Sequence, residues 1–174
     1  MEWYQIIFEM IDMRSFSNLW YWIALAVLWS TASHWVLGVP FDLITRARRD
    51  GGEAQQDLET MVRINVGRLL FIARTSGIWA IGFAFFIISA LMMLGFYYGI
   101  EFAQALMFFV VPMAILSGLS VRSARIIEAG ENEGAALHRR LARHRFSIQF
   151  LGMVSILVTS MFGMYQNLQI GVLG

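Results

Sequence analysis

His34 is the only histidine of this 174-residue chain within an apolar segment, and Ser30 and Ser33 lie close to it in sequence. An imidazole at membrane depth could ligate a haem or a chlorin, or take part in a proton path, because ionisable groups there are costly and mark function. A bis-histidine haem needs a second facing histidine, and only His138 and His144 remain, both in a basic segment. The alternative is a neutral histidine hydrogen-bonded to a neighbouring helix or to the headgroup region. We keep His34, Ser30 and Ser33 as a candidate cofactor or polar site, and expect no cofactor.

The segment 135–145, AALHRRLARHR, carries four arginines directly before an apolar run. Basic residues next to a membrane span contact anionic lipid headgroups and help to set the orientation of the chain. An acidic surface of a partner protein is the alternative, while nucleic acid is not expected because no aromatic platform accompanies the charge. The residues expected to contact headgroups are Arg139, Arg140, Arg143 and Arg145.

The run 146–168 has small residues at spacings of three and four: Gly152, Ser155, Thr159 and Gly163. Such a stripe lets another helix approach closely inside a membrane. The pattern therefore predicts a helix-packing face. An oligomeric channel lined by Ser30, Ser33, Ser155 or Thr159 is a different use of the same polar groups.

Motifs of known catalytic chemistry are missing from the sequence. There is no Walker loop, no His-Glu-x-x-His and no Gly-x-Ser-x-Gly, and the chain has no cysteine. We therefore expect no catalytic residues, no metal site and no enzyme activity.

The composition indicates that these residues are positioned by membrane helices. Hydrophobic residues make up 58% of the chain and charged residues only 14%, whereas soluble domains have roughly 45–50% and 25%. Four apolar runs, at about 19–39, 78–96, 102–119 and 146–168, are each close to bilayer length. Because only residues 97–101 join the second run to the third, these two must be antiparallel. The sequence predicts an all-α fold: one transmembrane domain, residues 1–174, forming an integral membrane four-helix bundle.

Residues outside the spans are also expected to be helical. Residues 2–16 form an amphipathic pattern too short and too charged to span, and are typical of an interfacial helix. The connecting regions 40–76 and 121–145 are predicted to form cytoplasmic helical extensions. The helix 53–74 could stand as a stalk, lie flat on the membrane or pack on the segment 135–145, and Gly77 is the expected place for a bend.

The distribution of arginine predicts the topology. All thirteen basic residues are arginine, and twelve of them lie in the two long connecting regions. By the positive-inside rule these regions are cytoplasmic, and both termini are periplasmic because the number of spans is even. We expect a multi-pass protein of a bacterial inner membrane.

The run MRSFSNLWYWIALAVLWSTASHWVLGVPFDLITRARR, followed by the helix 53–74 and the hairpin, resembles a family of uncharacterised alphaproteobacterial four-span inner-membrane proteins. Some members carry the label "component of SufBCD complex". The label implies a link to iron–sulfur assembly. A chain without cysteine cannot hold a cluster through thiolates.

The leading hypothesis is a non-enzymatic inner-membrane accessory or scaffolding protein. It self-associates as a homo-oligomer or joins a larger membrane complex as a subunit. One alternative is a small homo-oligomeric channel. A second is a haem- or pigment-binding membrane subunit that uses His34.

Overall fold

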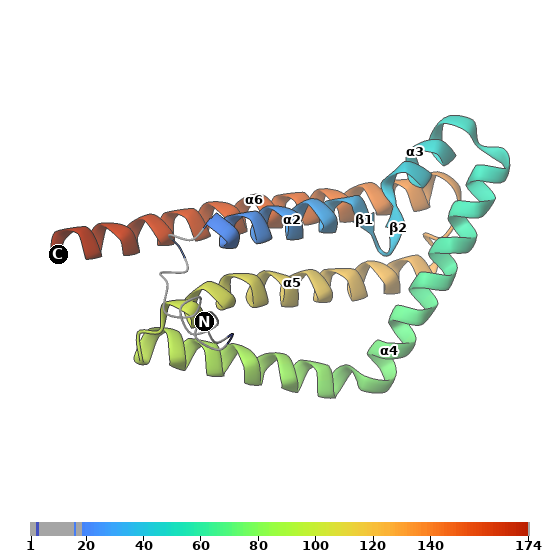
Figure 1. Cartoon of the computed structure of the whole chain (residues 1–174). Coiled ribbons are helices and arrows are strands. Elements are labelled where there is room, and N and C mark those ends of the chain that lie inside the picture. Colours follow the sequence, from blue (N-terminus) through green and yellow to red (C-terminus); the bar gives the residue numbers. More distant parts are fainter. Residues whose placement is uncertain (1–2, 4–15, 17–18, 174) are drawn as a thin grey trace.

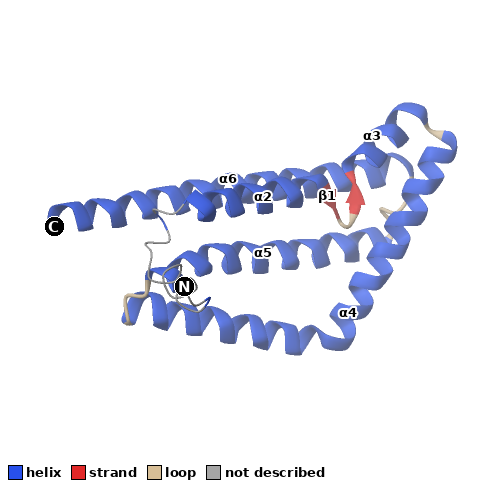
Figure 2. Cartoon of the chain, in the orientation of Figure 1, coloured by secondary structure: helices blue, strands red, loops and turns tan. Residues whose placement is uncertain are grey.

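The computed structural model describes Trp3, Phe16 and residues 19–173, without the side chains of residues 170, 172 and 173. Figure 2 shows that helices make up nearly all of this part of the chain, which confirms the all-α expectation. The predicted interfacial helix 2–16 lies outside the described residues, apart from Trp3 and Phe16. The elements in order are α2 (Leu19–His34), β1 (Trp35–Val36), β2 (Val39–Pro40), α3 (Phe41–Asp50), α4 (Gly52–Met92), the π-helical segment η2 (Met93–Tyr97), α5 (Glu101–Ala129) and α6 (Gly134–Leu173).

Three helices are long and apolar enough to cross a membrane. They are α4 continued through η2 (Gly52–Tyr97), α5 (Glu101–Ala129) and most of α6 (Gly134–Gln169). The predicted runs 78–96, 102–119 and 146–168 each lie inside one of them. The expectation of several membrane-length helices is thus confirmed.

The predicted first span, 19–39, is not one continuous helix. α2 ends at His34 after 16 residues, a length of roughly 24 Å at 1.5 Å per residue. Leu37 and Gly38 have φ angles of 52° and 75°, which reverse the chain, so that β1 and β2 pair as a short antiparallel hairpin. The Asn65 side chain donates a hydrogen bond to the Gly38 carbonyl (3.2 Å). α2 by itself is therefore shorter than the hydrocarbon core of about 30 Å.

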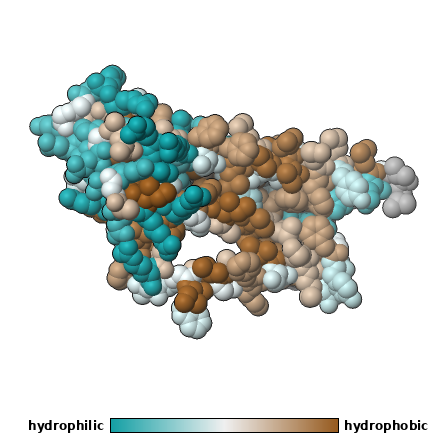
Figure 3. Space-filling view, turned by 180° about the vertical axis from the view of Figure 1, so that it is seen from behind, coloured by the Kyte–Doolittle hydropathy of each residue, from teal (hydrophilic) through white to brown (hydrophobic). Residues whose placement is uncertain are grey.

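Most of the helices lie roughly along one axis, and α3, the start of α4, the end of α5 and the start of α6 lie at one end of the molecule (Figure 1). α2 runs antiparallel to α6, and α5 lies beside them. The first part of α4 slants away from this axis, and its second part turns to run beneath α5. Figure 3 shows hydrophilic residues gathered at that polar end and hydrophobic residues along the remainder. We call residues 35–74 and 120–145 the head.

The head has a buried hydrophobic core. Its organising feature is a row at every fourth position of the first part of α4, from Ala54 to Leu70, which lies on one face of the helix. The helix 53–74 therefore packs against its own chain: Gln55 Oε1 is 2.7 Å from His138 Nε2, and the Gly134 amide donates to Glu59. The buried core residues are Val36, Val39, Ile44, Ala47, Ala54, Leu58, Val62, Val66, Leu70, Ala124, Ile127, Leu137 and Leu141.

The second part of α4 contrasts with the head. We call residues 78–96 the apolar arm. No residue of the most apolar eighteen-residue stretch of α4 is buried, and the space-filling view shows an opening between this arm and the body of the molecule (Figure 3). A Cβ atom on Gly77, Gly82 or Gly118 would meet nothing within 4 Å.

The end of the apolar arm farthest from the head is attached to the bundle through Gln104. This side chain is buried, and its Nε2 donates to the Gly95 carbonyl (2.7 Å). Gln166 of α6 donates to Gln104 Oε1 (2.8 Å). Gly95 is required here, because a Cβ atom would lie 2.9 Å from Gln104 Cγ. The arm is thus anchored at its far end. Residues 78–83 are exposed, while Ala84, Ile87, Ile88, Ala90 and Leu91 further along are half-buried.

Candidate functional site

The small-residue stripe of α6 faces α2 of the same chain. Gly152, Ser155, Thr159 and Gly163 are all buried. A Cβ atom on Gly152 would lie 3.0 Å from the Trp29 ring, so that indole occupies the space that the glycine leaves. The stripe is therefore covered within the chain, and no second copy is needed to cover it.

The polar residues of α2 do not form one site. Ser30 and His34 are exposed, and the His34 ring makes an edge contact with Trp35. Ser33 accepts a long hydrogen bond from Gln149 (3.4 Å). Within the described part of the chain, no three metal-ligating side chains come together. Ser155 and Thr159 are buried, while Ser30 is exposed.

The four arginines of segment 135–145 divide into two kinds. Arg140 Nε donates to Glu131 (2.6 Å), and the Arg145 guanidinium lies 3.7 Å from the centroid of the Phe41 ring. Both therefore have partners inside the head. Arg139 and Arg143 are exposed, and no carboxylate of the described residues lies within 4.0 Å of either.

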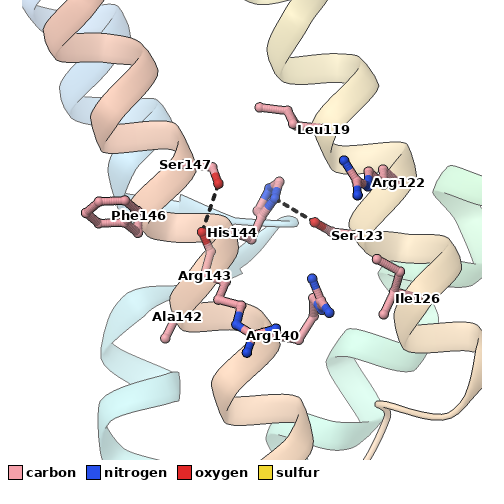
Figure 4. Close-up of a pocket in the computed structure, with 10 residues that line it drawn as sticks. All are labelled: Leu119, Arg122, Ser123, Ile126, Arg140, Ala142, Arg143, His144, Phe146 and Ser147. Carbon is pink, nitrogen blue, oxygen red and sulfur yellow. Dashed lines mark hydrogen bonds between the residues drawn. The ribbon is translucent and has the colours of Figure 1, made fainter.

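A cavity of about 540 Å³ opens between α5 and α6 at the edge of the head. Figure 4 shows its side chains coming from both helices. Its size lies within the range of small-molecule pockets, which is roughly 300–1,000 Å³. The lining residues are Leu119, Arg122, Ser123, Ile126, Arg140, Ala142, Arg143, His144, Phe146 and Ser147.

The floor of this cavity contains a serine–histidine pair. His144 Nδ1 is 3.0 Å from Ser123 Oγ, and both residues are buried. His144 lies in the head, outside the membrane-spanning segments; burial, together with the nearby Arg140 charge, lowers its pKa to about 4. The imidazole is therefore neutral at pH 7, and the positive charge of the cavity comes from its arginines.

The Ser123–His144 pair has only part of a catalytic triad. A triad needs a third group that orients the histidine, commonly a carboxylate. The second ring nitrogen of His144 instead faces the Ser120 hydroxyl at 3.5 Å. The two ring nitrogens of His144 thus face two serine hydroxyls.

A second cavity, of about 560 Å³, lies on the opposite side of α5, between α5 and the first part of α4. Its charged lining is mainly acidic, with Glu59, Glu128 and Glu133 set against Arg63. Hydrogen bonds from Gln55 and from the Gly134 amide stabilise the charged form of Glu59. The head thus presents two cavities of similar size and opposite charge.

Sequence reasoning included Arg143 among the lipid-contacting residues but did not connect it with Arg122, Ser123 or His144. A signal was present. Arg122 follows the last apolar residue of its run by three positions, and Arg143 precedes the first apolar residue of the next run by three. Since α5 and α6 are consecutive and antiparallel, equal offsets bring the two arginines to the same level.

No protein-family model, curated protein or solved structure gives a match to this chain.

Proposed function

We propose that this protein is a non-enzymatic accessory or scaffolding subunit of a bacterial inner membrane, which self-associates or joins a larger membrane complex. The observation that carries the proposal is the apolar arm. It is held at its two ends, by the head and by Gln104. Its most apolar stretch contains no buried residue, and an opening lies between the arm and the body of the molecule.

The opening beside the apolar arm suits another membrane helix. Lipid already solvates an apolar side chain, so helix association in a membrane depends on close packing rather than on the hydrophobic effect. Gly82 on the arm and Gly118 on α5 leave open space where a side chain would otherwise stand. These positions allow the backbone of a neighbouring helix to come close. A second copy of the chain is the occupant that needs no further component.

The test uses the absence of cysteine, because an introduced cysteine is then the only thiol in the chain. We expect the Gly82→Cys variant to form disulfide-linked dimers in native membranes. A matched Met161→Cys variant, whose side chain is exposed on α6, should not. Native mass measured after gentle extraction should be a multiple of the chain mass, or should include a stoichiometric partner. A monomer in which neither position crosslinks would contradict the proposal.

We further propose that α2 completes a fourth span, with the β1–β2 hairpin adding to its length and with both termini periplasmic. The head contains twelve of the thirteen arginines, which supports this orientation. In intact cells, a membrane-impermeant maleimide should label a Gln169→Cys variant and not an Ala129→Cys variant. The reverse labelling pattern would overturn the orientation.

A further inference from the structure

We propose that the cavity between α5 and α6 binds a phosphate-bearing anion through Arg122 and Arg143, either the phosphodiester headgroup of an anionic lipid or a free phosphate. The lipid source rests on the membrane placement proposed above, whereas the anion site itself rests on the head alone. The cavity is the one shown in Figure 4.

The balance of charge within the cavity favours an anion. Three arginines line it, and only Arg140 has a carboxylate partner, Glu131. No acidic side chain of the described residues lies within 4.0 Å of Arg122 or Arg143, and no acidic residue lines the cavity. Arg122 and Arg143 therefore line the cavity without a carboxylate at ion-pair distance. Their planar forks match the oxygens of phosphate better than an ammonium group would.

The position of the cavity favours the lipid as the source of the phosphate. Leu119 is the last residue of the apolar run of α5, and Phe146 is the first of the apolar run of α6. Both line the cavity, so its apolar rim faces the hydrocarbon while its arginines lie one turn further into the head. A phospholipid has the same order of groups across the membrane interface. Basic pockets between membrane helices on the cytoplasmic side bind such headgroups.

The acidic cavity on the other side of α5 gives an internal contrast. It has almost the same volume, but its lining carboxylates would repel a phosphate. Charge rather than space therefore decides where an anion binds on the head. Ser123 and Ser147 also line the basic cavity.

The experiment compares two double variants of the full-length protein. Arg122→Gln/Arg143→Gln removes the two unpaired charges of the cavity. The control, Arg68→Gln/Arg125→Gln, removes two exposed charges of the head that do not line it. Each protein is reconstituted in phosphatidylcholine nanodiscs with or without phosphatidylglycerol, and retained lipid is counted by native mass spectrometry.

We expect one phosphatidylglycerol per chain in the unmodified protein and in the control pair. The cavity pair should lose at least about tenfold in retention, because two charge-assisted contacts are removed. Equal losses in both pairs would overturn the site and leave only diffuse surface charge. Absence of retained lipid from the unmodified protein, together with no effect of phosphate, would also overturn it.

A second experiment distinguishes the two sources of phosphate. Inorganic phosphate is added to the detergent-solubilised protein, and the thermal midpoint of the head is measured. A shift of the thermal midpoint that the Arg122→Gln/Arg143→Gln variant abolishes, without lipid retention in the nanodisc experiment, would assign the site to a soluble phosphate. Lipid retention without such a shift would assign it to the membrane. The crosslinking of the Gly82→Cys variant is scored separately, so failure of the subunit proposal does not affect this result.

Discussion

The head and the apolar arm use similar residues in opposite ways, although α4 runs through both. In the head, Leu58 is fully buried, whereas in the arm Ile78 and Trp79 are 87% and 82% exposed. The first part of α4 is apolar on one face only, as in a soluble domain. The arm is apolar on all faces, which is typical of a helix solvated by lipid. The difference shows that a helix in contact with water buries its apolar face inside the protein, whereas a helix solvated by lipid can leave apolar side chains exposed.

The largest expected effect tests the core of the head. Leu58→Ala should destabilise the head by roughly 2–5 kcal/mol, because it removes packed atoms and leaves a cavity. Phe86→Ala, in the exposed part of the apolar arm, should cost less than about 1 kcal/mol, since lipid replaces the lost surface. The stability of both variants is measured by denaturation in detergent, with proteolysis of the head as the readout of unfolding. Equal losses would contradict the comparison.

A pH dependence should be confined to the head. The pKa of folded His144 is lowered to about 4, so the unfolded chain takes up a proton more readily below pH 6.5. Stability should therefore be constant above pH 6.5 and fall as the pH approaches 4, by up to about 3 kcal/mol. NMR titration of the imidazole measures the pKa directly. His144→Gln should flatten the pH profile.

His138 needs its own control in that experiment, because burial lowers its pKa as well. It lies beside Gln55 and Arg48, on another part of the head. A profile that is flattened by His138→Gln and unchanged by His144→Gln would assign the pH dependence to His138 and contradict the prediction for His144.

The attachment of the apolar arm at its far end should give the smallest of these effects. Gly95→Ala places a Cβ atom 2.9 Å from Gln104 Cγ and 3.1 Å from the Gln104 backbone nitrogen, a clash expected to cost about 1–3 kcal/mol. Gly67→Ala is the matched control in the same helix, because nothing lies within 4 Å of that position. It should be neutral or stabilise α4 slightly. Spin labels on the arm and on α5 should report a longer or broader distance only for Gly95→Ala.

Several features of the fold were predictable because they depend on local patterns. The apolar runs 78–96, 102–119 and 146–168 are continuous, and their length relative to a bilayer is sufficient to identify three membrane-length helices. The first run misled the prediction because its apolar character continues through the hairpin. The reversal at Leu37 and Gly38 depends on backbone angles and on a hydrogen bond from Asn65, which lies 27 residues away.

The candidate site was only partly predictable. Arg143 was recognisable as a basic residue next to a span, while its companion Arg122 lies 21 positions earlier, in another helix. The Ser123–His144 hydrogen bond likewise joins two helices. Such groupings depend on the angle and register at which α5 and α6 meet. A sequence pattern along one helix does not contain that information.

By itself, therefore, the sequence determined that this chain has helices long and apolar enough to cross a membrane, where they lie along the chain and where its positive charge gathers, because composition and periodicity are local properties. Only the tertiary structure decided which apolar residues become a core, that the stripe from Gly152 to Gly163 is covered by α2, and that the most apolar stretch of α4 contains no buried residue. It also decided which arginines remain unpaired. The physical reason is that packing and charge pairing depend on contacts between segments distant in sequence, and these exist only once the helices have assembled.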